Sequence, residues 1–190
     1  MPAPMSSKNP QAGFTLIETI IAILILTIGL ICTVAAITFA LQFAKVSRNA
    51  TGAKHLIVAQ IEEIENLRNI KRLTFGQIAN TGAVVNTGAA INFNGFQTGL
   101  QTISTNPGPD GVNGTSDDFT DAGADGTFGT GDDFTNNALA RSGYQREIII
   151  TQLSRFLKRV QVRVRYTGSG NTVAELSGVS YLNDDSRTTQ

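Results

Sequence analysis

The chain has little cysteine: Cys32 is the only one, and it lies in the most apolar part of the sequence. A single cysteine cannot form an intrachain disulfide, so cysteine content does not indicate the compartment. A lipid-attachment cysteine would follow small residues, whereas Cys32 follows Leu30 and Ile31. We therefore interpret Cys32 as a small apolar residue of a membrane segment.

The chain also lacks excess charge of either sign. Its 190 residues carry no net charge, which excludes a bulk electrostatic attraction to nucleic acid or to anionic lipid. Basic residues are missing between Arg72 and Arg141, although this stretch holds seven of the fifteen acidic residues. Such a cluster repels itself unless it is well solvated or binds cations. The length of the whole chain and its 41% hydrophobic content fit one modest domain plus an anchor.

Charged residues are absent from Thr19 to Ala44. As a helix this run would be about 39 Å long at 1.5 Å per residue, longer than the ~20 residues that cross a bilayer. It contains no proline and is too long for a secretory signal. We predict a membrane-spanning helix. Lys8 before the run places that end in the cytoplasm, but basic residues after the run oppose this, so charge alone leaves the orientation open.

Residues 13–18 read GFTLIE, between a short polar leader (residues 1–13) and the apolar run. This arrangement resembles the class III signal of the type IV pilin and type II secretion pseudopilin superfamily. The resemblance implies that a prepilin peptidase cuts between Gly13 and Phe14 and methylates the new amine of Phe14. It also implies that Glu18 of one subunit faces the Phe14 amine of its neighbour in a filament and sets their axial register.

Physical chemistry supports these expectations. Gly13 leaves the backbone bare for a protease, and a cut there precedes the apolar helix, so the anchor survives. An acid such as Glu18 at the mouth of a membrane helix is costly and marks a function with a partner. The ammonium that cleavage creates at Phe14 supplies an opposite charge. The alternative is that Glu18 is an interfacial residue that reaches toward the lipid headgroups.

The helical pattern continues past the membrane segment (residues 14–44) into residues 45–72. Its apolar residues are spaced by four, three and three positions, which predicts one buried face: Ile57, Ile61, Ile64 and Leu67. We predict one helix from about Thr15 to about Arg72, with a bend near Gly52. Residues 58–68 look like the corresponding helix of PilV-type minor pilins and of the I-type minor pseudopilin, which favours a minor subunit.

The remaining sequence predicts an irregular region and then a sheet. Residues 73–140 are rich in Gly, Asn and Asp, with one or two short strands expected near residues 84–85 and 91–96. Residues 141–190 predict antiparallel strands at 148–150, 160–166 and 173–182, with a turn at 167–171. The predicted fold is α+β and pilin-like: a long N-terminal helix packed on a C-terminal antiparallel sheet. One strand face is basic and could bind an anion or DNA, or could be a solvated or intersubunit face.

Residues 108–136 contain an internal repeat, because Asp110–Thr120 aligns with Asp125–Thr135 at an offset of fifteen. Ca²⁺ prefers six to eight oxygen ligands from a flexible loop, and glycines let backbone carbonyls turn inward. The order of residues is not that of an EF-hand. We predict a calcium site, and the alternative is a solvated, disordered acidic loop. The candidate ligands are Asp110, Asp117, Asp118, Asp125, Asp132 and Asp133.

The sequence shows no nucleophile–base pair, His/Cys cluster or phosphate-binding glycine loop, so we expect a structural protein rather than an enzyme. The resemblance implies a subunit of a pilus-like filament or secretion pseudopilus. The subunit would be anchored once in the inner membrane, with its C-terminal domain exported to a periplasmic or cell-surface filament. Its partners would be prepilin peptidase and other pilin or pseudopilin subunits. The alternative is a membrane-tethered surface protein that binds calcium or DNA without forming a filament.

Overall fold

The computed structural model describes residues 15–89, 91–168, 170 and 172–184. The chain divides into two compact units, residues 1–44 and residues 45–190. Helix α1 (Leu16–Asn69) contributes residues to both units. We call residues 16–44 of α1 the apolar segment and residues 45–69 the packing segment.

The apolar segment exposes its side chains within its own unit. Its large hydrophobic side chains range from 52% exposed at Ile21 to 79% exposed at Leu16. By length and composition, this helix can cross a membrane. Its four threonine hydroxyls donate hydrogen bonds of 2.7–2.9 Å to carbonyls of the preceding turn: Thr19, Thr27, Thr33 and Thr38. These bonds satisfy the polar groups locally, which lipid requires.

The packing segment buries the face that its spacing predicts. Ile57, Ile64 and Leu67 are at most 5% exposed, and Ile61 packs beside them. Full burial of one such side chain stabilises a fold by about 1.5–3 kcal/mol. The helix is continuous through Gly52, where a Cβ atom would lie 2.5 Å from the hydroxyl oxygen of Tyr144. The absence of a side chain at Gly52 therefore leaves room for the Tyr144 ring.

Helix α1 ends at Asn69, three residues before the predicted end. Lys71 adopts a left-handed conformation with φ of 57°. The amide of Arg72 donates to the carbonyl of Leu67 at 3.0 Å, and the amide of Lys71 donates to that of Arg68 at 2.9 Å. This is the Schellman arrangement, in which glycine usually occupies the left-handed position. The sequence did not predict this end of the helix, because a lysine and not a glycine takes the left-handed position.

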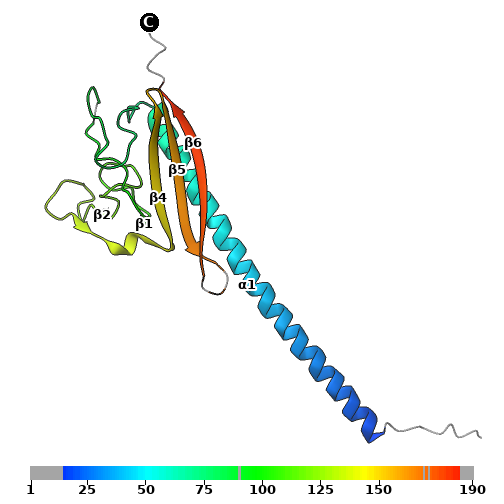
Figure 1. Ribbon diagram of the computed structural model, residues 1–190. Coiled ribbons are helices and arrows are strands. Elements are labelled where there is room, and N and C mark those ends of the chain that lie inside the picture. The colour runs from blue at the N-terminus through cyan, green and yellow to red at the C-terminus, as the bar shows by residue number, and fades with distance from the viewer. Residues whose placement is uncertain (1–14, 90, 169, 171, 185–190) are drawn as a thin grey trace, which may run out of the picture. The chain divides into compact units, whose positions relative to one another are not determined.

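The main sheet is antiparallel with strand order β1-β4-β5-β6 (Figure 1). The strands are β1 (Gln101–Ser104), β4 (Ala140–Ser154), β5 (Leu157–Thr167) and β6 (Val173–Asn183). The packing segment covers one face of this sheet, where buried side chains alternate along β5 at Val160, Val162 and Val164. The predicted pilin-like α+β fold is confirmed. The sequence did not indicate β1, which adds the irregular region to one edge.

The short strands predicted near residues 84–85 and 91–96 do not form, so that prediction is wrong. In the described part of residues 73–100, only an isolated bridge joins Asn80 to Phe96. Phe93 and Phe96 fill the core instead, at most 1% exposed and with ring centroids 5.2 Å apart, while Val85 and Ile91 are exposed. The Asn86 side chain receives the Phe93 amide at 3.1 Å, so the backbone is satisfied without a ladder.

Candidate functional site

Gly13 and Phe14, the predicted cleavage and methylation residues, lie outside the described residues. Helix α1 begins directly after them. The carbonyl of Thr15 accepts hydrogen bonds from the amides of Glu18 at 3.1 Å and Thr19 at 3.3 Å. Within the described residues, the helix starts at Leu16, close behind the predicted cut between Gly13 and Phe14.

Glu18 lies in the first turn of α1. A carboxylate there interacts favourably with the positive end of the helix dipole, typically by 0.3–1 kcal/mol. Among the residues that the structure describes, none forms a hydrogen bond or ion pair with the Glu18 carboxylate. The predicted pairing of Glu18 with the Phe14 amine of a neighbour stays a prediction.

The acidic repeat is a repeat in structure as well as in sequence. In the first copy, Asp117 accepts from the amide of Asp110 at 3.1 Å, and Asp110 accepts from that of Val112 at 2.8 Å. Fifteen residues later, Asp132 accepts from Asp125 at 3.3 Å and Asp125 from Thr127 at 2.8 Å. The ends of the two copies pair as β2 (Thr120–Asp121) and β3 (Phe134–Thr135).

The second aspartate of each acidic pair also has the same role in both copies. Asp118 accepts from the amide of Gly114 at 2.8 Å, and Asp133 accepts from that of Gly129 at 2.7 Å. A carboxylate that receives backbone N–H groups in this way holds a turn together without a metal ion. Each copy is therefore an ordered turn unit and not a disordered loop.

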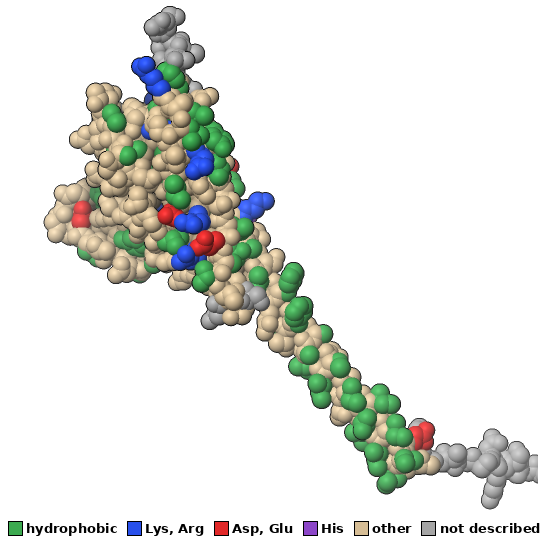
Figure 2. Space-filling model, viewed as in Figure 1, with side chains coloured by type: hydrophobic (Ala, Val, Ile, Leu, Met, Phe, Trp, Pro, Cys, Tyr) green, Lys and Arg blue, Asp and Glu red, His purple; other side chains and the backbone are tan. Residues whose placement is uncertain are grey.

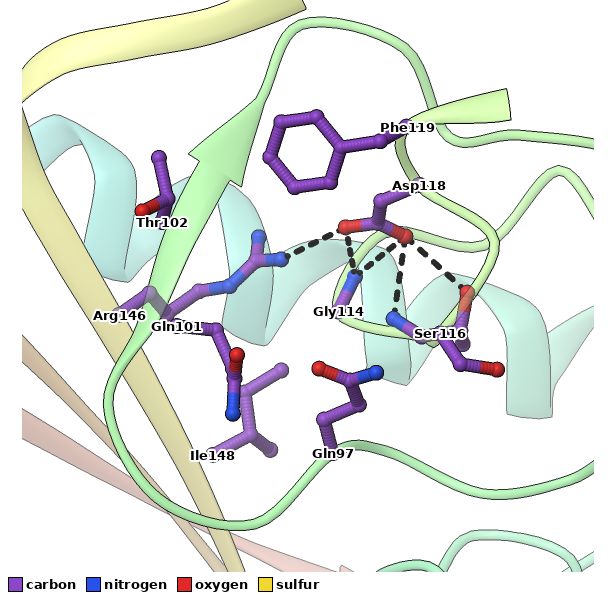
Figure 3. A pocket seen from close by; sticks show the side chains of 10 residues that line it. Gln97, Gln101, Thr102, Gly114, Ser116, Asp118, Phe119, Arg146 and Ile148 are labelled. Atoms are coloured by element: carbon purple, nitrogen blue, oxygen red, sulfur yellow. Dashed lines mark hydrogen bonds and ion pairs between the residues drawn. The ribbon is translucent and has the colours of Figure 1, made fainter. Parts of the chain in front are cut away.

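The first copy is bound to the rest of its unit by buried polar contacts. Figure 3 shows the Asp118 carboxylate between Gly114 and Arg146, with an Arg146 Nη2–Asp118 Oδ2 distance of 3.2 Å. Arg146 comes from β4 and also donates to Gln60 of the packing segment. Nearby, Glu63 accepts from the amide of Asn113 at 3.0 Å. These contacts join the repeat, the sheet and the helix.

Burial changes the ionisation of this region. Burial raises the pKa of Asp110 to about 6, although the amide of Val112 acts in the opposite direction, and repulsion from Asp117 raises it further. Burial also lowers the pKa of the Arg146 guanidinium, and the charge of Asp118 opposes that change. The site therefore holds an easily protonated acid beside a buried ion pair.

The structure uses the six candidate calcium ligands as hydrogen-bond acceptors within their turns. Within the described ranges, no group of three or more His, Cys, Asp or Glu side chains is placed to hold one metal ion. Calcium binding stays a prediction. Calorimetry of the full chain with millimolar Ca²⁺ tests it directly.

The basic strand face is largely neutralised. Arg163 pairs with Glu147, and Arg165 pairs with Glu175 at 2.7 Å. Figure 2 shows these signs side by side, as blue and red side chains over the strands. A surface in which carboxylates interleave with arginines does not offer the unbroken positive stripe that nucleic acid requires. The structure therefore gives no support to the DNA alternative.

The comparison with family models identifies the N-terminus. Residues 8–31 match the family described as the prokaryotic N-terminal methylation motif. The match supports the resemblance to type IV pilins and pseudopilins that residues 13–18 carry. The matched residues include Gly13, Phe14 and Glu18, together with half of the apolar segment. No curated protein and no solved structure matches the chain.

The match agrees with several of the sequence predictions in their general form. Proteins of this superfamily are structural and not enzymatic. The motif implies processing by prepilin peptidase and assembly with other pilins. The apolar segment fits an inner-membrane anchor that carries an exported domain. The subtype is not resolved by the match.

The sequence reading missed the residues that receive the first repeat copy. Arg146 and Gln60 are both polar and at most 6% exposed; Gln60 lies on the predicted helix, and Arg146 lies just before the strand predicted at 148–150. Lys158 is likewise buried and donates to the carbonyls of Phe75 at 2.6 Å and Ile78 at 2.8 Å. Only the position of Gln60 could have indicated its burial, since Gln60 interrupts the apolar stripe on the buried side of α1.

Proposed function

We propose that this chain is a structural subunit of a type IV pilus-like filament or a type II secretion pseudopilus. One observation carries the proposal: the methylation motif leads directly into a helical segment whose apolar side chains nothing in its own unit covers. Such a surface must be covered by lipid or by other subunits. A filament uses both, because the subunit waits in the membrane and then packs against its neighbours.

Lateral packing of apolar segments supplies contact area but does little to fix the axial offset between subunits. Lipid is as apolar as these side chains, so association depends on close packing and on polar contacts. Cleavage after Gly13 creates a positive chain end at Phe14, and Glu18 of a neighbouring subunit is the acid that would pair with it. A buried charge is stabilised only when it is paired. The pair therefore fixes the axial offset between subunits.

The similarity of residues 58–68 to minor pilins and minor pseudopilins favours a minor subunit, which primes or decorates the filament. This assignment rests on a short stretch of the packing segment. The identity of the neighbouring genes would distinguish a pilus from a secretion system. The competing proposal is a simple membrane tether, in which the apolar segment anchors the domain and no subunit contacts are made.

Mass spectrometry of the protein purified from membranes separates these proposals. We expect the mature chain to begin at an N-methylated Phe14. The variant Gly13→Leu should keep its leader, because a bulky side chain obstructs the protease, whereas the adjacent variant Ala12→Ser should be processed normally. An unprocessed chain that starts at Met1 or Met5 in the unsubstituted protein would support the tether instead.

A further inference from the structure

The two copies of the acidic repeat differ in what they contact. Arg146 binds the carboxylate of Asp118 in the first copy, and Arg72 donates to the carbonyl of Asp110 at 2.6 Å. The equivalent acceptors in the second copy are Asp133 and the carbonyl of Asp125. In the described part of the chain, no lysine or arginine contacts either of them. The first copy thus shows that this turn unit can bind basic side chains, and the second copy has no such partner among the described residues.

The second copy is partly apolar and is exposed except at Asp133, which is half-buried and whose Oδ1 atom has no hydrogen-bond partner in the described chain. Val112, in the first copy, is fully buried, while the second copy exposes Phe128 by 37% and Phe134 by 52% beside its acidic pair. Aromatic side chains and arginines are enriched at protein interfaces, so the two exposed rings and an arginine partner for the acidic pair fit a contact surface. We call residues 125–135 the acidic knob.

The outer face of the sheet carries a surface of complementary character. Arg159 on β5 lies opposite Tyr181 on β6, and Val179 is the next outward residue of β6. Tyr181 is 61% exposed and Val179 is 47% exposed. Unlike Arg163 and Arg165, Arg159 has no carboxylate partner among the residues that the structure describes, and its Nε atom donates to no acceptor there. We call Arg159, Val179 and Tyr181 the outer patch.

We propose that the acidic knob of one subunit docks on the outer patch of a second copy of this chain. Arg159 of the neighbour would take the place at Asp133 that Arg146 takes at Asp118, with Phe134 against Tyr181. A guanidinium on a carboxylate is a strong and geometrically specific contact, and aromatic rings add to it. The contact joins two different surfaces, so it can repeat from subunit to subunit, as a filament requires.

This inference rests on the proposed function and requires that copies of this chain are neighbours in the filament, so it applies to a subunit that is present in several adjacent copies and not to a single priming subunit. Disulfide trapping of the full chain tests it in cells that assemble the filament. Cys32→Ser first removes the native cysteine, and Asp133→Cys and Arg159→Cys are then placed in the same chain. Mild oxidation should give disulfide-linked dimers and higher multimers. Ser116→Cys with Arg159→Cys is the matched control, since Ser116 is exposed in the first copy, and it should stay monomeric.

Charge reversal provides a second measurement that does not depend on cysteine chemistry. Asp133→Arg alone and Arg159→Asp alone should each lower the yield of sheared filaments about fivefold or more. The two reversals together should restore most of it, because the ion pair is rebuilt with opposite orientation. Asp133→Asn keeps the acceptor for the Gly129 amide, so a loss of yield with this variant shows that charge and not folding is responsible.

The outcomes separate the inference from the proposed function. Filaments that assemble normally with each single reversal, and no multimers on oxidation, would overturn the docking contact and leave the filament assignment intact. Absence of any filament from the unsubstituted chain would overturn the proposed function itself. A trapped contact that disappears on chelation of Ca²⁺ and is unaffected by Arg159→Asp would also overturn the inference, in favour of a calcium bridge at the acidic knob.

Discussion

The apolar segment and the packing segment belong to one helix, yet each follows different rules. Residues 16–44 are apolar on every side and bury nothing within their own unit. Residues 45–69 are amphipathic, and one face supplies core residues to the second unit. The first segment therefore has its partners outside the chain, and the second has them inside. Substitutions in the first should alter assembly, and substitutions in the second should alter stability.

The largest effect that would sharpen this contrast is at Glu18. We expect Glu18→Ala to lower incorporation into filaments by about tenfold or more, where each tenfold corresponds to about 1.4 kcal/mol. The lost contact is the proposed pair with the neighbouring Phe14 amine. Incorporation is measured by immunoblot of sheared filaments against the membrane pool.

The control for this prediction is Glu62→Ala, an exposed acid of the packing segment, which should assemble normally. Glu18→Gln keeps the size and a polar group, so reduced incorporation of this variant would show that the charge of Glu18 is responsible. Unchanged incorporation of Glu18→Ala would leave only a membrane tether and would remove the difference between the two segments.

The next largest effect is on stability. Ile64 is fully buried, and Ile64→Ala should lower the free energy of unfolding by about 2–5 kcal/mol through lost burial and a cavity. The matched variant Ile25→Ala, in the apolar segment, should change it by less than about 0.5 kcal/mol. Urea unfolding of the full chain in detergent micelles, followed by tyrosine fluorescence, compares them. Equal effects would contradict the division between the segments.

A polar pair of variants tests the same contrast more finely. Gln60 accepts from Arg146 and donates to the carbonyl of Asn113 at 3.2 Å. Gln60→Ala should cost about 1–3 kcal/mol, because it leaves buried groups unsatisfied. Gln42→Ala removes an exposed glutamine of the apolar segment and should leave unfolding unchanged. A stability loss for Gln42→Ala would show that the apolar segment supports the folded domain.

The smallest predicted effect is a pH dependence confined to the second unit. Asp110 has a pKa of about 6 in the folded state against 3.8 ordinarily. A raised folded pKa means that the folded state binds the proton more tightly, so this contribution to stability is complete below about pH 4 and is lost as pH rises through 6. Asp110→Asn should remove that contribution.

The measurement is the difference in unfolding midpoint between the unsubstituted chain and Asp110→Asn at pH 5 and at pH 7. Other titrating groups are common to both chains and cancel. Relative to the variant, the unsubstituted chain should be more stable at pH 5 than at pH 7. A difference of the opposite sign would show that contacts with Arg72 and the Val112 amide outweigh burial of Asp110.

The sequence by itself determined the elements whose side chains repeat with a fixed period. The apolar stripe of α1 and the alternation along β5 follow from local geometry, because helix and strand periods decide which residues share a face. The motif at residues 13–18 was readable for the same reason, since its residues are contiguous, and the match of residues 8–31 agrees with it. The repeat of residues 110–135 was visible as an alignment, although its hydrogen bonds were not.

Only the tertiary structure decided which of the two repeat copies is buried and what each polar side chain meets. Asp118 and Asp133 stand in equivalent positions of similar sequence, but Arg146, distant in the chain, reaches only Asp118. Lys71 ends α1 without the usual glycine, and Phe93 and Phe96 enter the core without forming a strand. For Asp118 and for the two phenylalanines a long-range contact decides the outcome, and such contacts leave no periodic trace in the sequence. At Lys71 the local hydrogen bonds of the Schellman motif decide it.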